Sequence, residues 1–310
     1  MRIQYYLEKT LNIKGKIMNK RFRKLIDFIN LKKNEYIKDE NINNDRVIGS
    51  ETMTKKMPVL FLGHGSPMNV VLDNDYTRDL IELGKTLEKP KAILVLSAHW
   101  KTRGGYINYA DKPKQIYDFS GFPEELYNIK YEPNGGLEYA EKVYRILEED
   151  GYKLTEEWGL DHGAWGVLKF LFPNADIPTF QVSLNANLSE AEHYKIGRKL
   201  AKLREEGILI IGSGNIVHNF QYFDYEMYGE GSKEAKEFDN YIKEALLNND
   251  SEKIVNYKKL GNLAKFAAPS DEHYLPMIYI SALQEEDDKV EFIHESIQNR
   301  TMSMRSVKIG

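Results

Sequence analysis

PVLFLGHGSP (residues 58–67) is an apolar run that ends abruptly in a glycine-rich turn with a histidine in it. Two later stretches repeat this arrangement. Residues 91–96 run into Ser97-Ala98-His99-Trp100, and residues 207–211 run into Gly212-Ser213-Gly214-Asn215, with His218 shortly beyond. Short apolar runs without alternation are typical of strands that are buried on both faces of a mostly parallel sheet. The sequence therefore predicts buried strands at these places, each followed by polar residues.

Segments with helical periodicity lie between and after these runs. Residues 137–150 place apolar side chains at helical spacing and then reach Gly151, which suits a C-terminal cap. Ser189 and Glu192 have the spacing of a capping box and open a predicted helix that reaches Glu206. A further helix is predicted over residues 233–247. The alternation indicates one α/β domain, with a central mostly parallel or mixed sheet flanked by helices.

Charge divides the 310-residue chain near residue 56. Residues 1–56 hold 14 Lys and Arg against 7 Asp and Glu, although the whole chain has a net charge of −4. We therefore expect a basic N-terminal extension over residues 1–56 and one domain over residues 57–310. Three interpretations of the extension stay open: a disordered surface tail, a non-native upstream segment with Met53 or Met57 as the true start, and a basic amphipathic or organelle-targeting segment.

Composition excludes several classes of protein. The chain has no cysteine, so disulfides, thiolate zinc sites, iron–sulfur clusters and a cysteine nucleophile are excluded. No apolar run reaches 18 residues, so we expect no membrane span. The negative net charge argues against a nucleic-acid partner. Residues 1–56 show no secretory signal pattern, and we expect a cytoplasmic protein, with organelle targeting by that segment left open.

Five of the seven histidines fall where a ligand site is expected. In open parallel sheets, ligands bind just beyond the carboxyl ends of the strands. Three of these histidines follow predicted strands and two lie in turn-like segments; in chain order they are His64, His99, His162, His218 and His273. Together they predict an imidazole-rich metal site, and imidazole suits Fe(II), Zn(II), Cu or Ni. Ligand type alone does not choose among these metals.

Other residues have plainer interpretations. His193 lies inside a predicted helix and His294 shares strand parity with Val290 and Phe292, so both are expected to be structural. Several aromatic residues are candidates for lining a pocket, although ordinary packing is the more common role for each: Trp100, Phe119, Phe122, Trp165 and Tyr274. No segment has the order of a nucleophile elbow or of a phosphate-binding loop.

Five motifs in register carry a resemblance that no single motif would carry. They are Gly63-His64-Gly65-Ser66-Pro67-Met68, Ser97-Ala98-His99-Trp100, Asp161-His162-Gly163-Ala164-Trp165-Gly166, Gly212-Ser213-Gly214-Asn215-Ile216-Val217-His218-Asn219 and Glu272-His273-Tyr274-Leu275-Pro276. With residues 118–123 and 302–306, they make the chain from about Met57 to Gly310 resemble the class III extradiol ring-cleavage dioxygenases of the DOPA-dioxygenase (LigB-like) type. The resemblance implies a single α/β domain with its metal pocket at one edge of the sheet.

The resemblance also implies roles for the histidines. His64, His99 and His273 would be metal ligands. His218 matches a position that is either a fourth ligand or the active-site base, and His162 matches a histidine near the substrate that acts as acid, base or hydrogen-bond donor. Some branches of the superfamily use glutamate as the third ligand; here the matching segment offers His273, with Glu272 beside it.

The implied reaction is the opening of a catechol ring, as in DOPA, by O2 next to the two hydroxyls rather than between them, to give a semialdehyde acid. The implied metal is Fe(II), because zinc lacks the redox chemistry, while Zn(II) is a candidate occupant of the same site in purified protein. His162 or His218 would take a hydroxyl proton as the catechol binds. Two alternatives stay open: a zinc-dependent hydrolase and a non-catalytic ligand- or peptide-binding protein on the same fold.

Overall fold

The computed structural model describes residues 56–310. The predicted extension of residues 1–56 lies outside the described residues except for Lys56, so its interpretations stay predictions. Within residues 56–310, none of the helices combines the length and the apolar character that crossing a bilayer requires.

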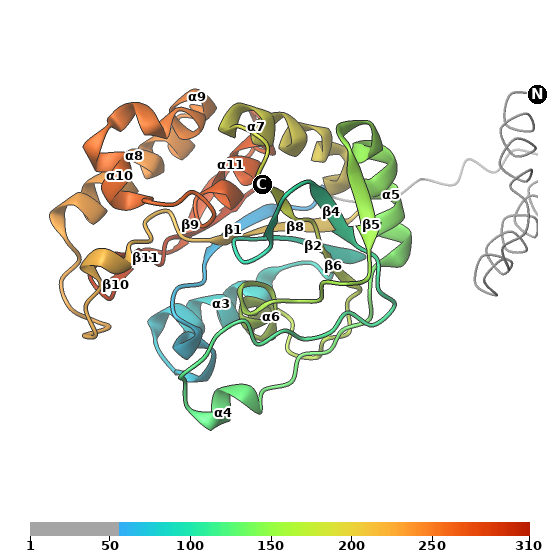
Figure 1. Cartoon of the computed structure of the whole chain (residues 1–310), viewed down its shortest axis with the longest axis horizontal. Coiled ribbons are helices and arrows are strands. Elements are labelled where there is room, and N and C mark those ends of the chain that lie inside the picture. Colours follow the sequence, from blue (N-terminus) through green and yellow to red (C-terminus); the bar gives the residue numbers. More distant parts are fainter. Residues whose placement is uncertain (1–55) are drawn as a thin grey trace, which may run out of the picture. The chain divides into compact units, whose positions relative to one another are not determined.

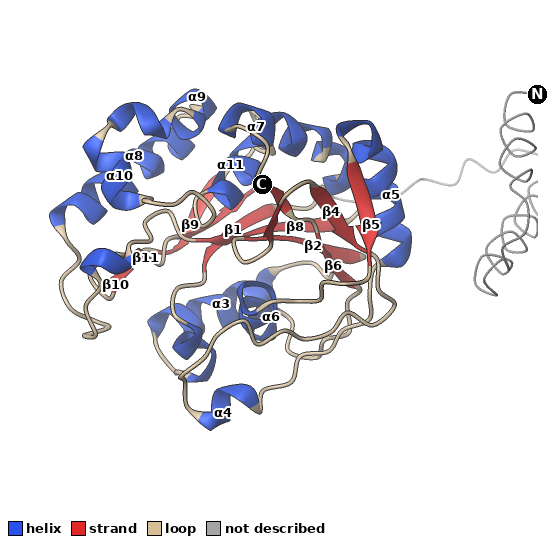
Figure 2. Cartoon of the chain, viewed as in Figure 1, coloured by secondary structure: helices blue, strands red, loops and turns tan. Residues whose placement is uncertain are grey.

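A six-stranded sheet forms the centre of the domain, with the strand order β6-β2-β8-β1-β12-β9 (Figures 1 and 2). Its strands are β1 (Val59–Gly63), β2 (Ala92–Ser97), β6 (Thr179–Gln181), β8 (Ile208–Gly214), β9 (Val290–His294) and β12 (Ser306–Ile309). β6, β2, β8 and β1 are parallel neighbours, and β12 and β9 extend the sheet antiparallel beyond β1. The prediction of a mostly parallel, mixed sheet is confirmed.

The three predicted apolar runs form strands β1, β2 and β8, and every residue of these strands is buried. Their side chains alternate between two hydrophobic clusters on opposite faces of the sheet. Leu60 and Leu62 belong to one cluster, whereas Val59 and Phe61 belong to the other. Because both faces need covering, the strands carry no polar face, which explains why their sequences do not alternate.

Helices cover both faces of the sheet (Figure 2). One face is covered by α3 (Asp75–Thr86) and α6 (His162–Leu171). The other carries a larger group, namely α5 (Leu137–Leu147), α7 (Glu190–Lys199), α8 (Lys233–Leu247), α9 (Ser251–Val255), α10 (Asn262–Ala267) and α11 (Leu275–Ala282). A short helix, α4 (Glu124–Tyr127), lies in the long connection before α5.

Short strands pair outside the main sheet. They are β3 (Lys101–Thr102) with β7 (Leu184–Asn185), β4 (Gly105–Asn108) with β5 (Tyr152–Thr155), and β10 (Ile297–Gln298) with β11 (Met302–Ser303). Sequence periodicity gave no sign of these pairs, because two to four residues are too few to show a pattern.

Two of the three predicted helices end as expected and one is shorter. α5 continues as a 3-10 turn to Asp150 and is capped by Gly151, whose φ is 80°; α8 spans residues 233–247. The capping box of Ser189 and Glu192 is present, but α7 ends at Lys199. The chain then tightens into a 3-10 turn, Ala201–Arg204, which brings the fully buried Arg204 against Asp288.

Candidate active site

The five predicted site histidines come together at one edge of the sheet. β1 ends one residue before His64, β2 ends two before His99 and β8 ends four before His218. Since these strands are parallel neighbours, their carboxyl ends meet at the same edge. His162 is the first residue of α6, and His273 lies two residues before α11. All five side chains line one cavity of about 570 Å³.

The rings of His64 and His99 face each other through their Nε2 atoms, which are 3.1 Å apart. The outer nitrogen of each ring is already engaged. Nδ1 of His64 lies 2.9 Å from Ser213 Oγ, and Nδ1 of His99 lies 3.0 Å from an oxygen of Asp118. With Nδ1 held, each ring is oriented so that Nε2 is the atom left for a ligand, which is the arrangement of metal-binding histidines.

Asp118 joins two histidines of the site. Its Oδ2 lies 3.0 Å from Nδ1 of His162 as well as 3.0 Å from Nδ1 of His99, and its Oδ1 accepts a 2.9 Å hydrogen bond from the backbone N–H of His162. Burial alone would raise the pKa of Asp118, but the hydrogen bonds from the two imidazoles hold that pKa well below its ordinary range. A carboxylate therefore orients both rings.

His273 and His218 form a stacked pair on another side of the cavity. Their ring centroids are 3.6 Å apart and their planes differ by 4°. The ring of His273 is also close to both facing imidazoles, at 5.3 Å from His64 and 5.1 Å from His99 between centroids. His218 therefore contacts the ring face of His273.

Burial keeps most of these rings in the neutral form that binds metals. It lowers the pKa of His64 and of His273 well below the usual value, and lowers the pKa of His218 to about 4. His99 differs: burial alone would lower its pKa, but the hydrogen bond to Asp118 and nearby carboxylates raise it overall. A metal site made of neutral imidazoles next to one carboxylate suits the transition metals predicted above.

Among the described residues, His64, His99 and His162 each place a ring nitrogen within 4.8 Å of the other two. The expected ligand set was His64, His99, His218 and His273, so the trio shares two members with it. A ring nitrogen separation of 3.1 Å between His64 and His99 also fits two ligands of one ion, because metal–nitrogen bonds of about 2.0–2.1 Å place adjacent ligand atoms at about that distance. The residues present therefore fit a metal, and the choice of the remaining ligands stays a prediction.

A glycine allows this close assembly. Gly163 lies in the first turn of α6, and a Cβ atom there would lie 2.6 Å from Ser97 Oγ and 3.1 Å from a ring carbon of His99. Either distance is shorter than a normal contact, so only glycine lets α6 approach the end of β2. This approach places His162 beside His99, with ring centroids 4.1 Å apart.

Sequence reasoning missed the residues that orient the histidines. The motif at residues 118–123 predicts no role for Asp118, and Ser213 between its two glycines predicts a turn and no contact with a histidine. Asp161, directly before His162, is the N-cap of α6: it accepts from the backbone N–H of Ala164 and from Ser97 Oγ. One signal could have identified Asp118: it belongs to the motif at residues 118–123, which lies outside every predicted strand and helix and therefore has no structural explanation in the sequence.

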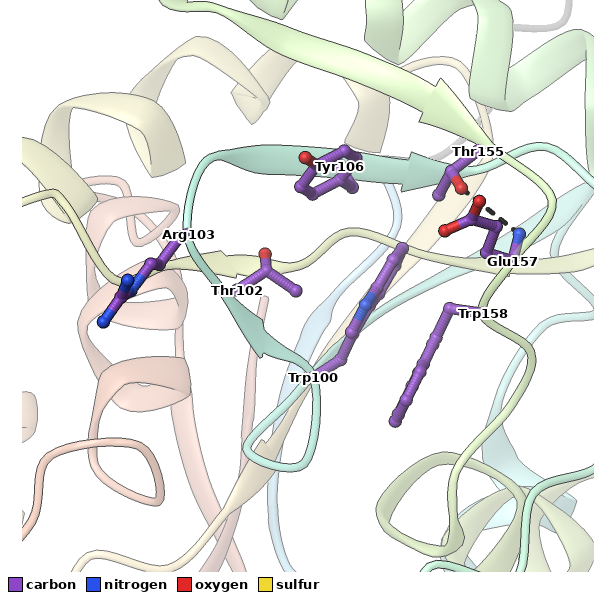
Figure 3. A pocket seen from close by; sticks show the side chains of 7 residues that line it. All are labelled: Trp100, Thr102, Arg103, Tyr106, Thr155, Glu157 and Trp158. Carbon is purple, nitrogen blue, oxygen red and sulfur yellow. Dashed lines mark hydrogen bonds between the residues drawn. The ribbon is translucent and has the colours of Figure 1, made fainter.

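The candidate aromatic residues separate into three groups. Phe119 and Phe122 line the histidine cavity. Trp165 and Tyr274 are fully buried in the cores. Trp100 lines a second hollow of about 460 Å³, where its ring lies parallel to that of Trp158, with centroids 5.9 Å apart (Figure 3). Three of the five therefore line a hollow, and two of these line the histidine cavity.

The two histidines expected to be structural do lie outside the cavity. His193 is buried on α7, where its Nδ1 is 2.9 Å from the hydroxyl of Tyr279. His294 ends β9 and lies 2.7 Å from a carboxylate oxygen of Asp79. Neither has a ring near the five site histidines.

Comparison with known proteins agrees with this geometry. Residues 59–310 match the family described as the catalytic LigB subunit of aromatic ring-opening dioxygenase. The chain is 41% identical over 261 residues to a protein of Escherichia coli (strain K12) named 4,5-DOPA dioxygenase extradiol, covering 82% of this chain and 95% of the relative. A protein of the same name from Beta vulgaris is 37% identical over 267 residues, covering 84% and 98%.

A solved structure is also similar. It is that of an uncharacterized protein from Escherichia coli K12, which is 37% identical in sequence and superimposes with a TM-score of 0.73. The match covers 82% of this chain and 100% of that one. The α/β fold and the family match cover the same part of the chain, and the chain belongs to the LigB family of catalytic subunits of aromatic ring-opening dioxygenases.

Proposed function

We propose that this extradiol dioxygenase opens the ring of a DOPA-like catechol with O2 at a histidine-bound Fe(II), giving a semialdehyde acid. The observation that carries the proposal is the pair of facing Nε2 atoms of His64 and His99, 3.1 Å apart, with both outer nitrogens held by hydrogen bonds. The names of the relatives support the substrate class, since they are called 4,5-DOPA dioxygenases.

We assign the metal to His64, His99 and His273. All three rings are neighbours in one cavity, and burial keeps His64 and His273 neutral and ready to bind. When bound, Fe(II) supplies the electron transfer between catecholate and O2 that Zn(II) cannot supply, so zinc in the purified protein is expected to be inactive. His218 is the proposed fourth ligand if a fourth is used.

His162 is the proposed base for the catechol hydroxyl. Asp118 accepts from its Nδ1, which places the proton of the neutral ring on Nδ1 and leaves Nε2 as an acceptor toward the cavity. A neutral imidazole is suited to take a hydroxyl proton at neutral pH. His218, which lines the same cavity, is the proposed proton donor during ring opening if it is not a ligand.

Residues 57–310 are the proposed catalytic domain, with residues 1–56 a dispensable extension. The family match starts at residue 59, which supports this division. The proposed location is the cytoplasm. A truncated chain that begins at Met57 should fold and keep full activity, whereas a loss of activity would assign a role to the extension.

The test is an anaerobic reconstitution of the full chain with Fe(II), followed by oxygen-electrode measurements with DOPA and a panel of catechols. We expect O2 consumption in step with a yellow semialdehyde product. Zn(II)-loaded protein is the matched control and should consume no O2. An absence of O2 uptake with every catechol would contradict the proposal, and hydrolysis by the zinc form without O2 uptake would favour a hydrolase.

A further inference from the structure

A second hollow lies outside the histidine cavity. Its volume of about 460 Å³ is within the range of small-molecule sites, about 300–1,000 Å³. It shares no lining residue with the histidine cavity. Its walls come from two segments, one that runs from Trp100 through β3 into β4 and one that runs from the end of β5 towards α6 (Figure 3). The ring-opening reaction proposed above uses none of its residues.

Aromatic rings form the apolar part of this hollow. The indole ring of Trp158 is stacked on that of Trp100, with an angle of 6° between the ring planes and 5.9 Å between the centroids. Figure 3 shows the two rings parallel, with Tyr106 above them in this view. Trp100 is buried, whereas Trp158 and Tyr106 are partly exposed. Accessible aromatic surface in a hollow suits a planar ring, because aromatic pairs gain more than the area that they bury.

Two exposed side chains of opposite charge line the same hollow. Arg103 lies in the turn between β3 and β4, and Glu157 lies in the segment after β5. Within residues 56–310, neither the guanidinium of Arg103 nor the carboxylate of Glu157 has a hydrogen-bond or ion-pair partner. Both charges are therefore available to a ligand. A guanidinium binds a carboxylate through two parallel hydrogen bonds, and a carboxylate accepts from an ammonium group.

The turn that carries Arg103 is held by hydrogen bonds on both sides of this residue. The Thr102 hydroxyl donates to the Gly104 carbonyl at 2.9 Å, and the Gly104 N–H donates to Asn185 Oδ1 at 3.1 Å. The φ of Gly104 is 99°, a conformation that favours glycine. The position of the Arg103 backbone at the edge of the hollow is therefore fixed by the fold.

Trp158 is also held from several directions. Its carbonyl accepts from the side chain of Asn108, and its Nε1 donates to a carboxylate oxygen of Asp161 at 3.4 Å. The next residue has to be glycine, because a Cβ atom at Gly159 would lie 1.8 Å from the carbonyl oxygen of Lys114. A binding surface that is already ordered loses less conformational freedom when a ligand binds.

We propose that this hollow is a second binding site, for a free aromatic amino acid. The ring lies against Trp158 and Tyr106. Arg103 binds the carboxylate, and Glu157 accepts from the ammonium group. An aromatic amino acid carries all three of these groups, whereas an arylpropionate or an arylethylamine carries only two. The site needs neither a metal nor O2, so this inference goes beyond the ring-opening function and does not depend on it.

The experiment measures binding to the full chain, before metal is added, by isothermal titration calorimetry. The probes are L-phenylalanine, 3-phenylpropionate, which lacks the ammonium group, and phenethylamine, which lacks the carboxylate. We expect L-phenylalanine to bind with a Kd of about 1 mM or below, and each of the other two at least about fivefold more weakly. An absence of L-phenylalanine binding, or equal binding of all three probes, would overturn the inference. Neither result would bear on ring opening, since none of the probes is a catechol.

Tryptophan fluorescence locates the bound ring. The chain has three tryptophans; Trp100 and Trp158 line the hollow, and Trp165 is fully buried in the core. Excited at a wavelength that phenylalanine does not absorb, the unaltered chain should change its fluorescence as L-phenylalanine binds. Trp158→Phe should remove most of that change. Heat of binding without any change in fluorescence would place the ligand elsewhere and overturn the inference.

Two variants assign the charged ends of the ligand. Arg103→Gln should weaken the binding of L-phenylalanine and 3-phenylpropionate by about fivefold and leave that of phenethylamine unchanged. Glu157→Gln should weaken the binding of L-phenylalanine and phenethylamine by a similar factor and leave that of 3-phenylpropionate unchanged. Both side chains are exposed, so both variants are expected to fold. Unchanged affinity for all three probes in either folded variant would overturn the inference.

Controls separate the hollow from the rest of the molecule. Arg78→Gln and Glu82→Gln are matched to the two charge variants, because these exposed residues lie on α3 and do not line the hollow. Both should leave all three affinities unchanged. His64→Ala alters the histidine cavity and not the hollow, so it should still bind L-phenylalanine. Loss of binding in His64→Ala would place the ligand in the histidine cavity and overturn the inference.

Discussion

Two carboxylates in this domain, the half-buried Asp118 and the buried Asp239, have opposite surroundings. Asp118, at the carboxyl ends of the parallel strands, is shared by the imidazoles of His99 and His162. Asp239, on α8 near the antiparallel side of the sheet, accepts from Arg305 Nε at 2.9 Å and from Ser303 Oγ at 2.5 Å. Asp118 thus orients two imidazoles that line a cavity, whereas Asp239 is surrounded by its hydrogen-bond partners.

The difference lies in what the partners have left to bind. Arg305 is 3% exposed and its remaining nitrogens contact Asp239 and Glu295, so its donors are used within the fold. The imidazoles at Asp118 keep Nε2 free for a ligand once Nδ1 is held. The ion pair of Asp239 and Arg305 therefore serves the fold alone, whereas the imidazoles held by Asp118 can still bind a ligand. Four substitutions would break or sharpen this contrast.

The largest effect is expected for His64→Ala. It removes one of the two facing Nε2 atoms, so bound metal should fall from about one ion per chain to near zero and O2 uptake should fall at least about 10³-fold. Metal analysis after reconstitution measures the first quantity. His294→Ala, outside the cavity, is the control and should keep its metal. Full metal content in His64→Ala would mean that this histidine is not a ligand.

Asp239→Asn should act on stability. Removing the charge leaves Arg305 buried with only Glu295 to balance it, and breaking a buried pair costs about 3 kcal/mol. Urea unfolding should therefore show a lower midpoint, while the folded fraction still binds metal. An Asp239→Asn protein with normal stability but impaired metal binding would remove the contrast between the two regions.

Asp118→Asn should act on the site. The amide can still accept from one imidazole but no longer offers a charge to both, so metal affinity or ring-opening activity should fall by about 10–100-fold. The unfolding midpoint should change little, because Asp118 borders an open cavity. A titration with Zn(II) measures affinity without requiring turnover. If Asp118→Asn lowered the unfolding midpoint but left the metal affinity normal, the role of Asp118 would be structural, like that of Asp239.

The smallest effect is expected for His193, in how the free energy of unfolding depends on pH. Burial lowers its pKa to about 4, so between pH 6.5 and pH 4 the unfolded chain binds the proton more readily than the folded one. Its contribution to stability is full above pH 6.5 and is lost as the pH falls through that window, by on the order of 2 kcal/mol. His193→Gln should flatten this part of the stability profile. An unchanged profile would show that His193 does not titrate there.

The fold was largely predictable because the central strands are apolar throughout. Burial on both faces leaves a continuous signal in residues 59–62, 92–96 and 208–211, and the turns that follow place the histidines. Of the antiparallel strands, β9 shows strand parity at Val290, Phe292 and His294 although it is only partly buried. β12 is short and contains a serine and a lysine, and its sequence predicts no strand.

The site was predictable in its histidines but not in the groups that orient them. Asp118 comes from a connection without regular structure, and no periodicity relates it to His99 or His162, which are 19 and 44 residues away. Only the folded chain brings the three together. The end of α7 at Lys199 was also not predictable from helical spacing, because the turn that follows it carries Arg204, whose partner Asp288 lies 84 residues away in the sequence.

The place of β12 has a consequence for biosynthesis. β1 pairs with β8 on one side and with β12 on the other, so the strand that precedes His64 has as a neighbour a segment that is made after all five site histidines. Until residues 306–309 have left the ribosome, one edge of β1 has no partner, and neither Arg305 nor Met304 can reach its place. The metal site should therefore mature only after translation has passed these residues, and a nascent chain stalled before them should bind no metal.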